Sequence, residues 1–104
     1  MITKKKAEKL LASQDEVDVI NTLLYICFNF DDWEWVQNIC LELMQSENDN
    51  ICGLAITCVG HLARIHSTID KVKILPILHE KMKDRRFTGR VEDALSDINM
   101  FVPI

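Results

Sequence analysis

The hydrophobic positions along the chain recur with the 3.6-residue period of an α-helix, and no stretch shows the alternation of a β-strand. Between residues 51 and 65, only Thr57, His61 and Arg64 carry polar side chains. A helix that is apolar nearly all round belongs in the interior of a domain. The whole pattern predicts six helices, at about 3–12, 14–29, 32–46, 49–66, 71–84 and 89–100.

Several residue types mark where these helices begin and how they pack. Ser13 followed by Glu16 is typical of a capping box, which makes Ser13 the expected N-cap of the second helix. An interior glycine costs about 1 kcal/mol relative to alanine, so close backbone packing should compensate at Gly53 and Gly60. Pro76 should kink or delay the first turns of its helix. The other expected N-caps are Asp31 or Asp32, Asp70 and Thr88.

The third and fourth predicted helices resemble the fifth and sixth at an offset of 39 residues. Val36 then falls on Leu75, and Val59 falls on Ile98. Two-helix units that recur at about 40–47 residues are typical of HEAT and armadillo repeats. The sequence therefore predicts an all-α fold, a short HEAT-like stack of antiparallel helix hairpins that forms one domain over residues 1–104.

Length and composition agree with a folded helical domain. The chain has 104 residues, 48% of them hydrophobic and 27% charged, and only three glycines and two prolines interrupt it. A membrane-spanning helix needs about 20 mostly apolar residues, and no stretch reaches that length. No apolar signal region follows the lysines at 4–6, so the expected location is the cytoplasm.

The four cysteines lie in apolar helical runs without the C-x-x-C spacing of a metal site. They are expected to be buried, reduced thiols, as in cytosolic proteins. We expect neither a metal nor a cofactor. The cysteines are Cys27, Cys40, Cys52 and Cys58.

Charge is segregated along the chain, within a net charge of −4. Residues 10–63 contain nine acidic residues and no lysine or arginine, whereas residues 1–9 contain four lysines. An acidic field repels nucleic acid and attracts basic surfaces. The segment 10–63 therefore favours a basic protein partner over nucleic acid or a membrane, although a merely solvated polar face would look similar.

One cluster of ionisable residues could suggest catalysis, but its spacing favours a structural role. His61 and Arg64 share a helix face, whereas His66 lies on the other side of the helix. Pairing with acids of the last helix, such as Asp93, accounts for these residues, since ion-pair networks resemble active sites. Ser67 is too close to His66 to form a catalytic triad. The protein is not expected to be an enzyme.

Two large amphipathic side chains, Tyr25 and Trp35, lie on or near the polar arcs of acidic helices. Tyrosine and tryptophan often carry the binding energy of protein interfaces, although edge packing explains a half-exposed tryptophan equally well. We expect the carboxylates of helix 14–29 to lie near the exposed arc of helix 49–66, and those of helix 32–46 toward the other side. The predicted partner-binding residues are Asp15, Asp18, Tyr25, Asp32, Glu34, Trp35 and Glu42.

Motifs in the second half of the chain resemble small HEAT-like immunity proteins of bacterial contact-dependent growth inhibition (CDI) and related polymorphic toxin systems. The residues that carry the resemblance are Gly-His-Leu-Ala-Arg-Ile-His at 60–66 and Gly-Arg-Val-Glu-Asp-Ala-Leu at 89–95. The resemblance covers roughly residues 31–101, and it implies an intracellular protein that binds and neutralises a cognate toxin domain, often a nuclease. We expect a monomer that forms a 1:1 complex with the toxin. The toxin would be a basic nuclease, with an RNase favoured. The alternative is a generic HEAT-like adaptor or enzyme subunit that binds another protein.

Overall fold

The fold is all-α, as the periodicity predicts. The computed structural model describes residues 2–103, and those residues contain no strand. All six predicted helices are present, and the fourth has the predicted ends. The helices are α1 (Lys4–Leu11), α2 (Glu16–Asn29), α3 (Trp33–Leu43), α4 (Asp49–His66), α5 (Lys71–Met82) and α6 (Thr88–Phe101).

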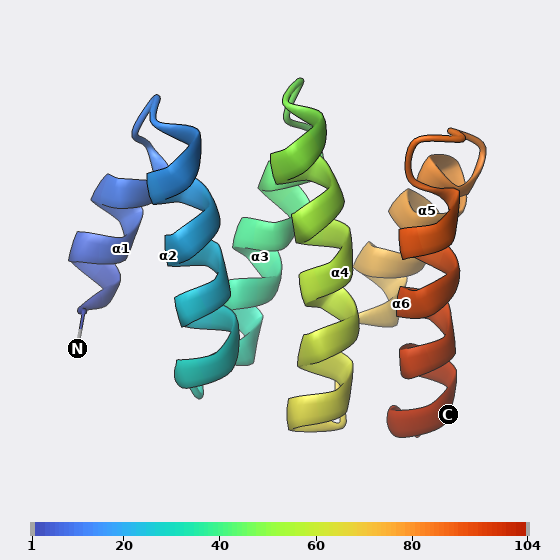
Figure 1. Ribbon diagram of the computed structural model, residues 1–104. Helices are drawn as coiled ribbons and strands as arrows, with labels where there is room; N and C mark the ends of the chain where they lie inside the picture. The colour runs from blue at the N-terminus through green and yellow to red at the C-terminus, as the bar shows by residue number, and fades with distance from the viewer. Residues whose placement is uncertain (1, 104) are drawn as a thin grey trace.

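The helices follow one another as antiparallel hairpins (Figure 1). Helices α2, α4 and α6 stand side by side in one layer, α3 and α5 pass behind it, and α1 lies at its N-terminal edge. Consecutive hairpins thus stack in sequence order, which is the arrangement that the sequence predicts. The relation of these hairpins to HEAT repeats remains an interpretation of the 39-residue offset.

Helix α4 is the centre of the domain, as its nearly uniform apolar character predicts. It contacts α2, α3 and α6. Half of its residues are buried, a larger share than in any other helix. Gly60 allows α4 to pack closely against α6, because it has no Cβ. A Cβ at this position would lie 3.2 Å from the Cα of Ala94.

The start of α2 differs from the predicted capping box. Asp15, rather than Ser13, is the N-cap, and its side chain accepts a hydrogen bond from the backbone N–H of Val17 at 2.9 Å. The Ser13 hydroxyl instead accepts a bond from the N–H of Asp15, which makes a tight turn before the helix. Glu16 does not reach back to the cap, because its carboxylate accepts a hydrogen bond from Asn50 at the start of α4.

Two further expectations about helix ends were wrong. Thr88 is not an N-cap but the first residue of α6, and its hydroxyl donates to the backbone carbonyls of Met82 and Asp84. The delayed start that was one of the two effects expected of Pro76 does not occur, since α5 begins at Lys71 and continues through the proline. The predicted caps Asp32 and Asp70 are confirmed, each by a side-chain bond to a backbone N–H three residues later.

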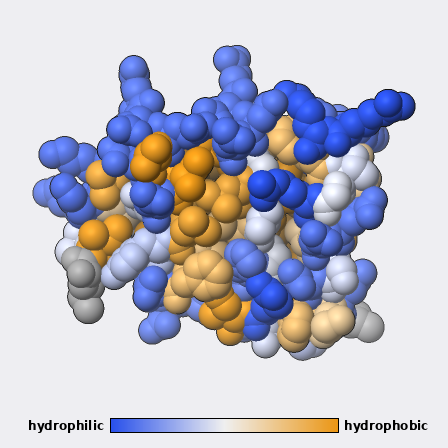
Figure 2. Space-filling view, viewed as in Figure 1, coloured by the Kyte–Doolittle hydropathy of each residue, from blue (hydrophilic) through white to orange (hydrophobic). Residues whose placement is uncertain are grey.

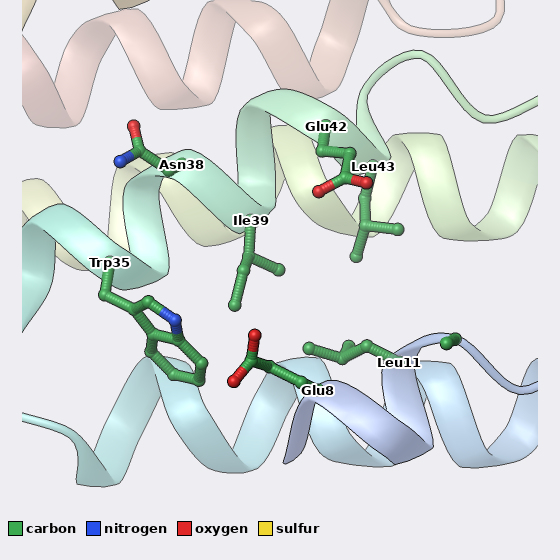
Figure 3. Close-up of a pocket in the computed structure, with 8 residues that line it drawn as sticks. Glu8, Leu11, Trp35, Asn38, Ile39, Glu42 and Leu43 are labelled. Atoms are coloured by element: carbon green, nitrogen blue, oxygen red, sulfur yellow. The ribbon is translucent and has the colours of Figure 1, made fainter. Parts of the chain in front are cut away.

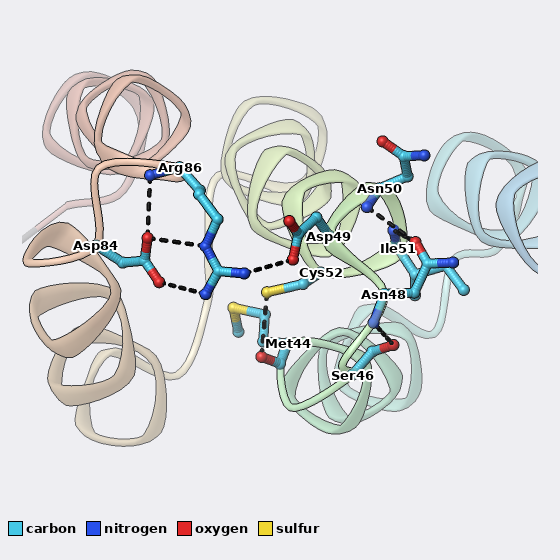
Figure 4. Close-up of polar contacts among 9 residues, drawn as sticks. All are labelled: Met44, Ser46, Asn48, Asp49, Asn50, Ile51, Cys52, Asp84 and Arg86. Carbon is cyan, nitrogen blue, oxygen red and sulfur yellow. Dashed lines mark hydrogen bonds and ion pairs between the residues drawn. The ribbon is translucent and has the colours of Figure 1, made fainter.

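An arginine joins the start of α4 to the turn between α5 and α6 (Figure 4). The Arg86 guanidinium donates to the Asp84 carboxylate at 2.6 Å and to the Asp49 carboxylate at 2.7 Å. Hydrogen bonds from Arg86 lower the pKa of Asp84 to about 2. These exposed contacts connect the first residue of α4 to a turn that is remote in sequence.

Candidate functional site

The two predicted aromatic residues belong to one cluster. The Trp35 ring stacks on Phe30, with the ring centroids 5.3 Å apart, and Tyr25 meets the same Phe30 edge-on at 6.4 Å. Tyr25 and Trp35 are both half-buried. Phe30 was missed as a functional candidate because it lies in the connection between α2 and α3, where helical periodicity carries no information.

A lysine of the basic N-terminal segment contacts this cluster. The Lys4 ammonium lies 5.3 Å from the centroid of the Trp35 ring and forms an ion pair with Asp32. The Asp32 carboxylate also accepts a hydrogen bond from the backbone N–H of Trp35. The bond from Lys4, followed by that from Trp35, lowers the pKa of Asp32. The charge of one predicted binding residue is therefore already balanced within the chain.

A groove of about 370 Å³ lies between α1 and α3 (Figure 3). Aliphatic side chains of both helices line it, together with one carboxylate from each helix. Two predicted residues, Trp35 and Glu42, lie in it. The lining residues are Glu8, Leu11, Ala12, Trp35, Asn38, Ile39, Glu42 and Leu43.

Helical spacing could have found most of this lining. Glu8, Leu11 and Ala12 share one face of α1 at spacings of three and four residues, and so do Trp35, Asn38, Ile39 and Glu42 on α3. The pattern does not reveal that the two faces lie opposite each other. Glu8 was therefore missed as a binding residue.

The remaining predicted residues lie outside the groove. Asp15 is exposed and occupied in capping α2, whereas Asp18 is half-buried on its first turn. Glu34 is exposed on the first turn of α3. The structure thus brings together Tyr25, Trp35 and Asp32 as one cluster and places Glu42 beyond Trp35 in the adjoining groove.

Part of the apolar arc of α2 faces solvent. Val17 is 60% exposed and Phe28 is 52% exposed. The Phe28 ring packs against the His61 ring of α4, with 5.0 Å between the ring centroids. Figure 2 shows a hydrophobic strip along α2 and the adjoining side of α4. We call Val17, Phe28 and the exposed Ile65 the α2–α4 strip.

His61 and Arg64, the residues that could suggest catalysis, are paired structurally, as their spacing in the sequence favours. Arg64 donates to Nδ1 of His61 and lies 3.9 Å from the Asp97 carboxylate of α6. The acidic partner is thus Asp97 rather than Asp93. Burial, followed by the charge of Arg64, lowers the pKa of His61. These residues join α4 to α6 along one shallow hollow.

All four cysteines are buried and unpaired, as expected. Cys27 donates its thiol proton to the carbonyl of Cys58, and Cys52 donates to that of Met44. Within residues 2–103, no three potential metal-ligating side chains lie together. Over the same residues, none of the helices combines the length and apolar character needed to cross a membrane.

These features define the protein as a small all-α domain with a surface groove lined by aliphatic side chains, two carboxylates and one tryptophan. No protein-family model matches the sequence, and no curated protein matches it. Among solved structures, it is similar to a chain in the crystal structure of a CDI complex from Cupriavidus taiwanensis LMG 19424. The two share 30% sequence identity with a TM-score of 0.85, over 96% of this chain and 90% of that chain. The protein belongs to the family of CDI immunity proteins, the family that its sequence motifs resemble.

Proposed function

We propose that this protein binds a cognate CDI toxin domain in the cytoplasm and neutralises it. The observation that carries the proposal is the likeness to a chain of a CDI complex over nearly the whole length of both chains. In this function the protein is an inhibitor and performs no catalysis itself. The pairing of His61 and Arg64 with α6 supports this, because it gives those residues a structural role.

The toxin domain that fits this surface is a basic nuclease, with an RNase favoured. Nucleases must present positive charge to the phosphate backbone of their substrate. Segment 10–63 contains no lysine or arginine, and seven of its nine acidic residues, all but Asp32 and Asp49, form no ion pair within residues 2–103 and supply the complementary charge. Complementary charge of this kind raises the association rate more than it raises the affinity.

The acidic side of α3 and the aromatic cluster beside it would make the contact. Glu34 and Glu42 are exposed, and neither forms an ion pair within residues 2–103. Asp15 and Asp18 of α2 would add to the same field. Trp35 and Tyr25 would supply the aromatic contact, and one monomer would bind one toxin domain.

The test is binding to a CDI toxin domain, with the product of the gene immediately upstream as the first to be tried, measured by stopped-flow kinetics across an ionic-strength series. Charge reversal at Glu34 and Glu42, or at Asp15 and Asp18, should slow association, and added salt should reduce the difference. The matched control is Glu92→Lys with Asp93→Lys, which reverses two exposed charges on α6. Absence of a complex would contradict the proposed function.

Growth and nuclease assays complete the test. The chain should restore growth to cells that produce the toxin domain and should block RNA cleavage by the purified domain. Cleavage of DNA with no cleavage of RNA would overturn the RNase assignment alone. A complex that forms without any loss of toxin activity would favour the adaptor alternative.

A further inference from the structure

We infer that the groove between α1 and α3 binds one arginine side chain of the toxin domain, an inference that rests on the proposed function. The groove is a concave site of about 370 Å³ between the lysine-rich α1 and the acidic α3. It combines an apolar lining with two carboxylates from facing helices (Figure 3). A long side chain with an apolar stem and a cationic head matches both features.

The apolar lining suits the stem of such a side chain. Leu11 of α1 and Ile39 and Leu43 of α3 project into the groove (Figure 3), and all three are half-buried. Arginine and lysine bury their methylene groups along apolar surface while keeping their charge in a polar environment. The aliphatic residues therefore give the groove a surface that the stem could cover.

The carboxylates suit a guanidinium in particular. Glu8 and Glu42 come from different helices and point toward the groove, and neither has a hydrogen-bond or ion-pair partner within the described residues. A guanidinium presents five N–H donors in one plane, so it can reach two carboxylates that an ammonium would contact as a point charge.

Trp35 closes one end of the groove in a fixed position. Its ring is stacked on Phe30 and covered by the Lys4 ammonium, so its orientation is set before any partner binds. Side chains that are already ordered lose little rotamer entropy on binding. Its indole N–H points toward the groove in Figure 3. Because the ring is held in place, a change in the NMR signal of this N–H indicates a ligand in the groove rather than a movement of the ring.

The α2–α4 strip is the competing surface. Val17 and Phe28 are exposed, whereas Leu11, Ile39 and Leu43 of the groove are half-buried. The residues of the strip are themselves uncharged and cannot select a basic partner, whereas the groove has two carboxylates. We therefore assign the charged contact to the groove and make the strip an outcome of the test.

The first experiment needs no toxin. Butylguanidinium, an arginine side-chain mimic, is titrated into the labelled protein while the indole N–H resonance of Trp35 is followed by NMR. The chain has two tryptophans, and Trp33→Phe assigns the signal. We expect a saturable shift with butylguanidinium and none with butylurea, its uncharged analogue of the same shape. The shift should disappear in Glu8→Gln/Glu42→Gln.

The matched control is Glu92→Gln/Asp93→Asn, which removes the same charge from α6 and should keep the shift. The urea midpoint of each variant checks that the exposed substitutions leave the fold intact. An equal shift with butylurea, an unchanged shift in Glu8→Gln/Glu42→Gln, or no shift at all would overturn the inference.

The second experiment measures affinity for the upstream-encoded toxin domain. Glu8→Gln/Glu42→Gln should weaken binding by at least about tenfold, while the α6 control should change it by less than about twofold. If Phe28→Ser weakens binding and Glu8→Gln/Glu42→Gln does not, the interface lies on the strip. The inference then fails and the proposed function stands. If the wild-type chain does not bind the toxin, the proposed function fails, and the butylguanidinium titration still decides whether the groove binds a guanidinium.

Discussion

The three glycines of the chain each lie within a helix, and replacing them one at a time by alanine measures how closely α4 packs on its neighbours. Alanine is favoured over glycine in a helix interior by about 1 kcal/mol, so the three substitutions share one favourable contribution. They differ in what the added Cβ meets. At Gly89 it meets nothing within 4 Å, whereas at Gly60 it meets the backbone of α6.

The structure sets the sign of each change. The new Cβ at Gly60 would lie 3.2 Å from the Cα of Ala94 and 2.8 Å from a carboxylate oxygen of Asp97. Overpacking of this kind costs about 1–3 kcal/mol, so Gly60→Ala should destabilise by about 1 kcal/mol net. Gly89→Ala should stabilise by about 0.5–1 kcal/mol. At Gly53 the Cβ meets only the flexible Arg90 side chain, so Gly53→Ala should fall between them.

Urea unfolding at 25 °C measures the free energy of unfolding of all three variants. Thermal unfolding should agree, with a shift in Tm of about 4–8 °C for each kcal/mol in a domain of this size. From most to least stable, we expect Gly89→Ala first, then Gly53→Ala and the wild type close together, and Gly60→Ala last. If Gly60→Ala is as stabilising as Gly89→Ala, the close approach of α4 and α6 is not a constraint. The account of why α4 carries an interior glycine would then be wrong.

Two further predictions concern the ion pairs and the buried amide of Gln37. Acidification should reduce stability as the pH falls from about 4 through about 2, because the pKa of Asp84 is lower in the folded chain than in the unfolded chain. Urea midpoints across this range should depend less on pH in Asp84→Asn, and an equal dependence would contradict the role of Arg86. Gln37→Leu should cost about 1–3 kcal/mol in urea unfolding, because the Asp70 N–H loses its 2.6 Å acceptor. An unchanged midpoint would show that water replaces the amide.

Local pattern was enough to predict the elements of this fold. The period of the apolar residues predicts all six helices, and the nearly uniform apolar character of α4 predicts its central place. The caps Asp32 and Asp70 could also be predicted, because an N-cap bonds to backbone only two or three residues away. The cap of α2 was wrong by two residues, since Ser13 and Asp15 compete for the same turn and only the backbone conformation decides between them.

Contacts between helices decided the surface. Lys4 and Asp32 are 28 residues apart, and nothing in either segment shows that they pair. A hydrophobic pattern defines the apolar arc of a helix about its own axis, but how much of that arc is covered depends on where the neighbouring helices lie. Phe28 is exposed because α4 covers only part of the arc of α2, and the groove exists because α1 stands beside α3. The sequence by itself therefore determined the helices, the buried centre and the acidic character of the chain. The tertiary structure alone decided which acidic and aromatic side chains share a site, because that depends on distances between helices that no local pattern records.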